Sequence, residues 1–172
     1  MSTAGRLSRH SRRSLRLTAA LVVCGLAGFP ASSVSQTPDL GALNGGNGFV
    51  AGGIAAGDHA GRSVSGAGDF NGDGIEDFLI GAEGVDGGPG LADAGSTYLV
   101  FGRSAFSSVL GLSTVNGSNG FVIPGGAENE RLGQAVSGIG DVNADGFADI
   151  LVGSDGADPD SLPLAGEAYV IF

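Results

Sequence analysis

A nine-residue pattern, Asp-x-Asn-x-Asp-Gly-x-x-Asp, occurs twice in this chain at a spacing of 72 residues. The first copy spans residues 69–77 and the second spans residues 141–149. Oxygen-bearing side chains at alternate positions of a tight turn point at one centre, and the glycine permits the sharp bend. The pattern therefore predicts two calcium-binding loops.

The expected ligands are the side-chain oxygens of positions one, three, five and nine, together with the backbone carbonyl of position seven. They are Asp69, Asn71, Asp73, Ile75 and Asp77 in the first loop, and Asp141, Asn143, Asp145, Phe147 and Asp149 in the second. The alternative is that both segments are acidic surface turns, because Asn, Asp and Gly are common turn residues. Two copies in equal sequence contexts favour the metal loops.

The loops differ from those of an EF-hand, which needs a bidentate Glu at position twelve and a helix after it. Position twelve is Ile80 in one copy and Val152 in the other. A short apolar run that ends in Gly follows each loop, at 78–81 and 150–153. Such runs predict buried strands, so we expect the loops to connect strands.

The similarity between the two halves of the chain extends beyond the loops. Three further pairs of segments match: 48–50 with 120–122, 61–68 with 133–140, and 95–101 with 166–172. Together they define a unit of about 72 residues with four strand-like segments. Repeats of this length are typical of arrays and propellers, in which one unit cannot bury its apolar surface alone.

On these residues the chain resembles the FG-GAP repeat proteins, which include the calcium-dependent β-propeller of integrin alpha subunits and related secreted bacterial proteins. The name-giving Phe-Gly is Phe101-Gly102, and the Gly-Ala-Pro element is reduced to Gly81-Ala82-Glu83 and Gly153-Ser154-Asp155. The resemblance implies an all-β fold of propeller blades with four antiparallel strands each. It also implies that residues 62–67 and 134–139 are the first, innermost strands of their blades.

The N-terminal region has the sequence of a signal peptide. Five Arg residues between Arg6 and Arg16 precede an uncharged, mostly apolar run from Leu17 to Phe29, and small residues suited to cleavage follow it. Thirteen residues are few for a membrane span, which favours a cleaved signal peptide. The alternative is that the segment is retained as a membrane anchor. We therefore expect a secreted or cell-surface protein, periplasmic or extracellular in a bacterium, with no direct membrane insertion after removal of the leader.

The expected organisation has five parts. They are a signal peptide at 1–35, a Gly-rich lead-in at 36–47, a first blade with a leading outer strand at 48–102, a Gly/Ser-rich linker at 103–119, and a second blade, truncated at its end, at 120–172. Propellers close with about four to eight blades, so two blades leave sheet edges open. The sequence favours a fragment of a longer protein with further blades in cis, and self-association is the alternative.

The charge distribution excludes several classes of function. All 18 acidic residues follow the leader, where only Arg62, Arg103 and Arg131 oppose them, and the chain contains no Lys. Three positive and 18 negative charges give the mature part a formal charge of −15. Such a surface repels nucleic acid phosphates and anionic membranes, so no nucleic acid partner is expected.

Candidate catalytic groups are few. His59 is the only His after the leader, and its sequence neighbour Asp58 does not make a catalytic triad. The paired carboxylates that suggest glycoside hydrolysis all belong to the calcium pattern. We expect no catalytic residues and no enzyme, but a calcium-binding module for cell-surface adhesion or recognition of a protein ligand. The alternatives are a carbohydrate-binding propeller and an accessory domain of a larger secreted hydrolase.

Overall fold

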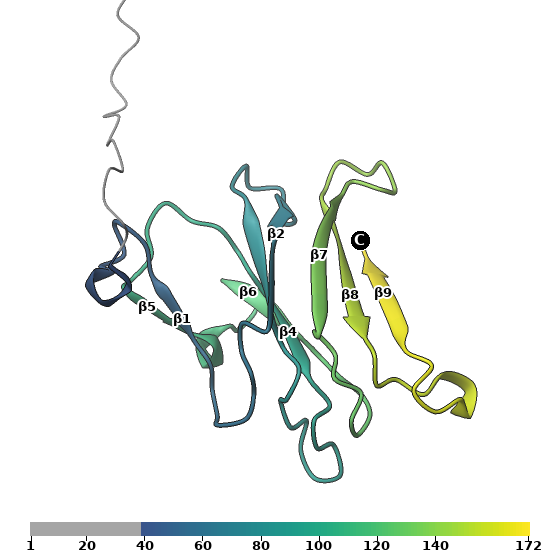
Figure 1. Ribbon diagram of the computed structural model, residues 1–172. Coiled ribbons are helices and arrows are strands. Elements are labelled where there is room, and N and C mark those ends of the chain that lie inside the picture. Colours follow the sequence, from purple (N-terminus) through teal and green to yellow (C-terminus); the bar gives the residue numbers. More distant parts are fainter. Residues whose placement is uncertain (1–38) are drawn as a thin grey trace, which may run out of the picture. The chain divides into compact units, whose positions relative to one another are not determined.

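A computed structural model describes residues 39–172, which form an all-β unit (Figure 1). The predicted signal peptide and the first residues of the lead-in lie outside this range. The described residues contain three short 3-10 turns, η1 at Leu40–Ala42, η2 at Leu112–Thr114 and η3 at Pro159–Ser161. No helix between residues 39 and 172 is long and apolar enough to cross a membrane.

The strands of residues 39–172 form two antiparallel sheets and one parallel pair. The first sheet has the order β2-β3-β4-β6, the second has the order β7-β8-β9, and β1 pairs with β5. Their bounds are β1 Val50–Gly52, β2 Ser63–Gly68, β3 Asp77–Ala82, β4 Ser96–Val100, β5 Val109–Gly111, β6 Gly120–Pro124, β7 Ala135–Gly140, β8 Asp149–Ser154 and β9 Glu167–Ile171.

The two sheets confirm the all-β blades that the resemblance implies. In each sheet the first strand leads through an acidic loop into the apolar second strand, and the third strand returns antiparallel. The strands β2 and β7 stand at one edge of their sheets and lie beside each other in the middle of the unit (Figure 1). They correspond to the segments expected as first strands.

The boundary between the blades differs from the expected one. The strand β6, expected at the start of the second blade, is the fourth strand of the first sheet, with Phe121 opposite Leu99 of β4. The strand β1, expected as the outer strand of the first blade, pairs with β5 instead. The periodicity of the sequence predicts where strands occur along the chain. It does not predict which strands pair with each other.

A shared apolar core lies between the two blades. Leu79 of β3 and Leu99 of β4 are fully buried there, and they pack in one cluster with Ile150 and Val152 of β8. Successive residues of a strand point to opposite faces of the sheet. The neighbours of Leu79 and Leu99 in β3 and β4 therefore point to the other face of the first blade. Burial of each such side chain stabilises the fold by about 1.5–3 kcal/mol.

The second core covers the opposite face of the first blade. Ile80, Tyr98 and Val100 point to this side and pack against residues of β1, β5 and η2. The rings of Phe49 and Phe106 stack there with centroids 4.2 Å apart. The first blade is therefore covered on both faces, by the second blade and by the β1–β5 pair.

The inner strands of the two blades approach closely because their residues are small. The Gly138 N–H donates to Ser65 Oγ at 3.2 Å, and Ser63 Oγ donates to the Gly133 carbonyl at 2.7 Å. A Cβ atom on Gly138 would overlap the Gly66 carbonyl and lie 3.0 Å from Ala67 Cα. A larger residue at this position has no room, which explains the Gly and Ser content of the strands.

The two blades differ in length at one hairpin. The strands β7 and β8 follow β2 and β3 at the spacing of 72 residues, whereas β9 follows β4 at a spacing of 71. The β3–β4 hairpin spans residues 83–95, and its counterpart at 155–166 is one residue shorter. The repeat therefore changes its length at the end of the blade opposite the acidic loops.

Candidate metal centres

Each acidic loop begins at a bulge that ends an inner strand. The pairing of β2 with β3 shifts register between Gly66 and Gly68, and that of β7 with β8 shifts between Gly138 and Gly140. Gly68 and Gly140 both have a φ of 72°, a conformation that glycine adopts without strain. The bulge turns the chain out of the strand and into the loop.

The side chains of the first loop gather around its own backbone amides. Asp69 accepts hydrogen bonds from the N–H groups of Asp73 at 2.9 Å and Gly74 at 2.8 Å, one on each oxygen. Asn71 Oδ1 accepts from the same Asp73 N–H at 2.9 Å. Asp73 Oδ1 accepts from the Ile75 N–H at 2.8 Å. The oxygens of positions one, three and five therefore all accept from the backbone amides of positions five to seven.

The second loop has the same arrangement. Asp141 accepts from the N–H groups of Asp145 at 3.1 Å and Gly146 at 2.9 Å, and Asn143 Oδ1 accepts from the Asp145 N–H at 2.9 Å. Asp145 Oδ1 accepts from the Phe147 N–H at 2.9 Å. The Phe147 bond, and secondly the bond from the Asn143 side chain, hold the pKa of Asp145 below its ordinary value.

Asp77, at position nine of the pattern, fixes the first loop to the sheet through buried hydrogen bonds. Asp77 is only 2% exposed. Its Oδ2 accepts from the N–H groups of Phe70 at 3.0 Å and Asn71 at 3.3 Å, and its Oδ1 accepts from the Gly102 N–H at 2.7 Å. This carboxylate ties both ends of the loop to the end of β4. The sequence signal for the anchor is the Phe101-Gly102 pair, whose glycine supplies the third donor.

The corresponding anchor in the second loop is less complete. Asp149 is fully buried, and its Oδ2 accepts from the Val142 N–H at 2.6 Å. Its Oδ1 has no hydrogen-bond partner among the described residues. In the first loop Gly102 bonds this oxygen, and the position equivalent to Gly102 comes directly after Phe172 in the repeat register. Among the described residues the second anchor therefore accepts one hydrogen bond, whereas the first accepts three.

The donors of each loop fit a hard cation such as calcium. Asp69, Asn71 and Asp73 offer carboxylate and amide oxygens, which calcium prefers, and each oxygen keeps a lone pair beyond its amide bond. Converging sets of three or more His, Cys, Asp or Glu side chains do not occur among residues 39–172. Each loop instead has two exposed carboxylates and one amide, since Asp77 is held below. The carbonyls of Ile75 and Phe147, with water, would complete the coordination.

The two loops touch each other. The Ala148 N–H donates to the Asp69 carbonyl at 3.2 Å. The ring of Phe147 lies against Gly72, where a Cβ atom would overlap it, and Gly72 has a φ of 73°. The candidate sites are therefore adjacent, and the backbone of the second loop is bonded to the first residue of the first.

The match to a known family covers the strands and loops just described. The FG-GAP repeat family matches residues 60–100 and 132–171, which contain β2–β4 and β7–β9 with their acidic loops. These two segments are FG-GAP repeats. FG-GAP repeats are typical of integrin-alpha-like propeller modules, commonly bind Ca²⁺, are usually non-catalytic and are typically extracellular.

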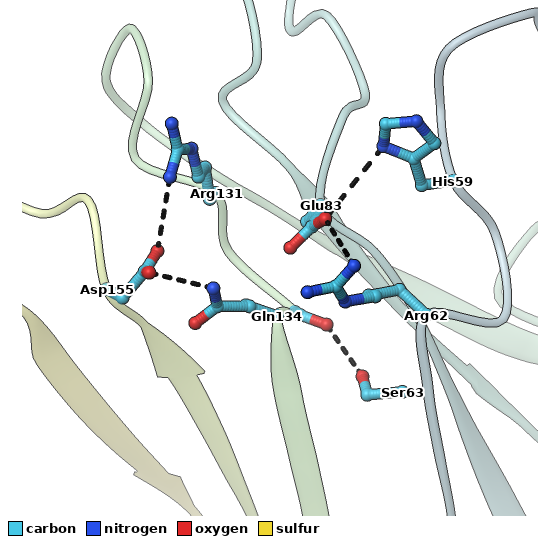
Figure 2. A network of polar contacts seen from close by, with 8 residues as sticks. His59, Arg62, Ser63, Glu83, Arg131, Gln134 and Asp155 are labelled. Carbon is cyan, nitrogen blue, oxygen red and sulfur yellow. Dashed lines mark hydrogen bonds and ion pairs between the residues drawn. The ribbon is translucent and has the colours of Figure 1, made fainter.

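A polar network occupies the end of the FG-GAP blades opposite the loops (Figure 2). Glu83 faces Arg62 at 3.7 Å and His59 at 3.9 Å. In the second repeat Asp155 faces Arg131 at 4.0 Å and accepts a hydrogen bond from Gln134 at 2.7 Å. A cleft of about 270 Å³ lies between the two clusters. Such exposed ion pairs contribute little to stability.

His59 belongs to this network through its contact with Glu83. Its side chain is 66% exposed, and its ion-pair partner is Glu83, while Asp58 points elsewhere and accepts from the Ala55 N–H at 2.8 Å. Arg131 occupies the equivalent position of the second FG-GAP repeat and makes the equivalent contact with Asp155. The repetition of the arrangement with Arg in place of His indicates a structural ion pair.

A hollow of about 500 Å³ lies between β6 and β9. Ile123, Leu132, Val152 and Tyr169 contribute to its wall. The Tyr169 hydroxyl donates to Glu167, and this bond, with burial and the nearby Glu130 as lesser causes, raises the pKa of Tyr169. In the first FG-GAP repeat Leu110 and Leu112 pack in the corresponding place beside Tyr98. The hollow beside Tyr169 is therefore equivalent to a place that apolar side chains fill beside Tyr98 in the first repeat.

Proposed function

We propose that the protein is an exported, calcium-binding FG-GAP propeller module that recognises a protein ligand at a cell surface and has no catalytic activity. The observation that supports it most is the agreement between the two loops. They share the same five internal hydrogen bonds although all four intervening residues differ. The loops thus retain the donors that calcium needs and vary elsewhere.

The proposed calcium sites and the proposed ligand-binding cleft lie at opposite ends of the blades. The calcium loops lie at one end of the blades, where they touch each other and leave little freedom for change. At the other end, Arg62 and Gln134 are equivalent in the repeats but differ in charge, and His59 and Arg131 are equivalent but differ in size and shape. A cleft lined by residues that change between repeats is suited to a specific ligand, whereas calcium stabilises the scaffold.

Calcium is expected to bind at two sites with dissociation constants on the order of 10⁻⁴ to 10⁻³ M, the range of extracellular modules. Each loop lacks the bidentate Glu that raises affinity in EF-hands, which is the reason for this modest value. Titration calorimetry measures both the number of sites and the affinity. The absence of heat with calcium, or an equal affinity for magnesium, would contradict the proposal.

The variants Asp73→Ala and Asp145→Ala are each expected to remove one site and to lower the melting temperature by a few degrees in calcium. At ten times the dissociation constant, one site stabilises the fold by about 1.4 kcal/mol. In a chelator the melting temperature should stay equal or rise, because one of several crowded carboxylates is gone. Calorimetric melting checks this. Glu128→Ala, which removes an exposed charge away from the loops, is the control.

Recognition is tested with beads that carry the protein and are incubated with cells in calcium or in chelator. The expected result is calcium-dependent adhesion that Asp73→Ala and Asp145→Ala weaken and that protease treatment of the cells abolishes. Adhesion that resists protease but is lost after removal of surface glycans would replace the protein ligand with a carbohydrate. Adhesion that is independent of calcium would contradict the link between the loops and recognition.

A further inference from the structure

The peptide group between Phe147 and Ala148 connects the two acidic loops. Its carbonyl is position seven of the second loop, where the pattern predicts a calcium ligand. Its N–H donates to the carbonyl of Asp69, position one of the first loop, at 3.2 Å. In a trans peptide the C=O and the N–H point in opposite directions within one rigid plane. This plane therefore lies between the two candidate sites.

The side chain of Phe147 makes a second connection. Its ring lies against Gly72, which stands in sequence between the first-loop donors Asn71 and Asp73, and a Cβ atom on Gly72 would overlap the ring. The methyl group of Ala148 also approaches the first loop, because a Cβ atom on Gly68 would lie 2.6 Å from it. Backbone and side chains of one dipeptide thus contact the start and the middle of the other loop.

The first loop has a glycine where this ring needs room. Position four is Gly72 in the first loop and Ala144 in the second, and both have a left-handed backbone, with φ of 73° and 63°. Since Ala144 adopts this conformation, the conformation alone does not require glycine. The ring of Phe147 occupies the place that a side chain of residue 72 would take. The difference between the two loops at position four therefore fits the contact between them.

We propose that Phe147 and its peptide group couple the two calcium sites, so that calcium in one loop raises the affinity of the other. The inference rests on the proposed calcium binding and adds a dependence of each site on the other. A cation on the Phe147 carbonyl draws electron density from the peptide, and the N–H becomes a stronger donor to Asp69. The same ion fixes the position of Phe147, and with it the position of the ring on Gly72.

The first loop gains affinity because it is held in place before it binds. Its donors Asp69, Asn71 and Asp73 belong to an exposed turn, which loses conformational freedom when a cation orders it. A turn that the second loop already fixes at Asp69 and Gly72 loses less, so that its binding costs less entropy. Coupling between two binding equilibria is reciprocal, so the first loop raises the affinity of the second by the same factor.

A calcium titration followed by NMR tests the proposal. The amides of Gly74 and Gly146 report the two loops separately, because each donates to the position-one carboxylate of its own loop. The full chain is compared with Asp145→Ala, which disables the second loop, and with Phe147→Ala, which keeps the backbone ligand and removes the ring. The titrations are made at an ionic strength of about 0.15 M, where a Debye length of about 8 Å limits repulsion between the two ions.

Ile75→Ala is the matched control. Ile75 is position seven of the first loop, and its side chain faces Gly102 at the end of β4. The substitution removes an apolar side chain from the same loop position as Phe147→Ala does. Each variant is read in the loop that it does not alter, at Gly74 for Phe147→Ala and at Gly146 for Ile75→Ala.

The first loop is expected to bind calcium about fivefold more weakly in Asp145→Ala than in the parent chain, and about threefold more weakly in Phe147→Ala. The midpoint at Gly146 should change by less than about twofold in Ile75→Ala. An unchanged midpoint at Gly74 in both variants would overturn the coupling and leave the calcium sites standing, and a loss in Asp145→Ala alone would overturn the role of Phe147. Absence of any calcium response at Gly74 and Gly146 in the parent would overturn the sites and the coupling together.

Discussion

Asp77→Asn is expected to lower the free energy of unfolding by about 3–5 kcal/mol, in calcium and in chelator alike. The carboxylate is buried and accepts three backbone hydrogen bonds, from Phe70, Asn71 and Gly102. The amide of Asn keeps one acceptor oxygen and turns an N–H₂ group toward at least one of these donors. A buried donor is then left unpaired, and the remaining bonds lose the charge that strengthens them.

Urea denaturation by linear extrapolation measures this loss. Asp73→Asn is the matched control, because it makes the same chemical change in the exposed part of the loop and keeps an oxygen for the Ile75 N–H. In chelator it should change the free energy of unfolding by less than about 0.5 kcal/mol. Asp149→Asn should cost less than Asp77→Asn, because among residues 39–172 only the Val142 N–H bonds that carboxylate. Equal effects of Asp77→Asn and Asp73→Asn in chelator would show that Asp77 is no anchor.

The second large effect is expected for Gly138→Ala, about 2–3 kcal/mol of destabilisation. The new methyl group overlaps the Gly66 carbonyl on the neighbouring inner strand, and a backbone atom in a sheet cannot turn away as a side chain does. The same change forces Ser65 away from the Gly138 N–H that it accepts. The two blades must then separate, and the core between them loosens.

Gly66→Ala is the control, since Gly66 is the repeat equivalent of Gly138 in an identical strand position. Nothing lies within 4 Å of a Cβ atom there, and the expected change is below about 0.5 kcal/mol. The comparison uses thermal and urea unfolding at a concentration where the protein is monomeric. A similar loss for both variants would mean that strand propensity, and not contact between the blades, determines the effect.

The period of the sequence was enough to predict the strands and loops of both blades. Apolar runs such as residues 78–81 and 150–153 become β3 and β8, and the small residues before the loops become β2 and β7. These features are local, because an apolar run predicts a buried strand wherever the fold places it. The convergence of Asp69, Asn71 and Asp73 was predictable for the same reason, since the turn itself brings them together.

The partners of the outer strands were not predictable in this way. The segments 48–50 and 120–122 match each other, but the match does not state that β6 pairs with β4 while β1 pairs with β5. That choice depends on which sheet edge is free, a property of the whole fold.

The role of Asp77 also required the structure. A nine-residue pattern marks the carboxylate as a ligand candidate, but its burial and its bond to Gly102 depend on the end of β4, 25 residues away. The cleft at the other end of the blades was missed because His59, Arg62 and Glu83 form no motif in sequence, and only the fold brings them near Arg131. Contacts between segments that are distant in the sequence therefore could not be predicted from local sequence patterns.

The unequal β3–β4 and β8–β9 hairpins make this protein a candidate display scaffold. Residues 83–95 and 155–166 already differ in length while the strands that they join keep their pairing, so the fold absorbs an insertion there without a shift of register. A peptide grafted between Gly88 and Leu91, both outside the strands, would project from the end away from the calcium loops. Such a graft would allow the metal-dependent scaffold and the displayed peptide to be varied separately.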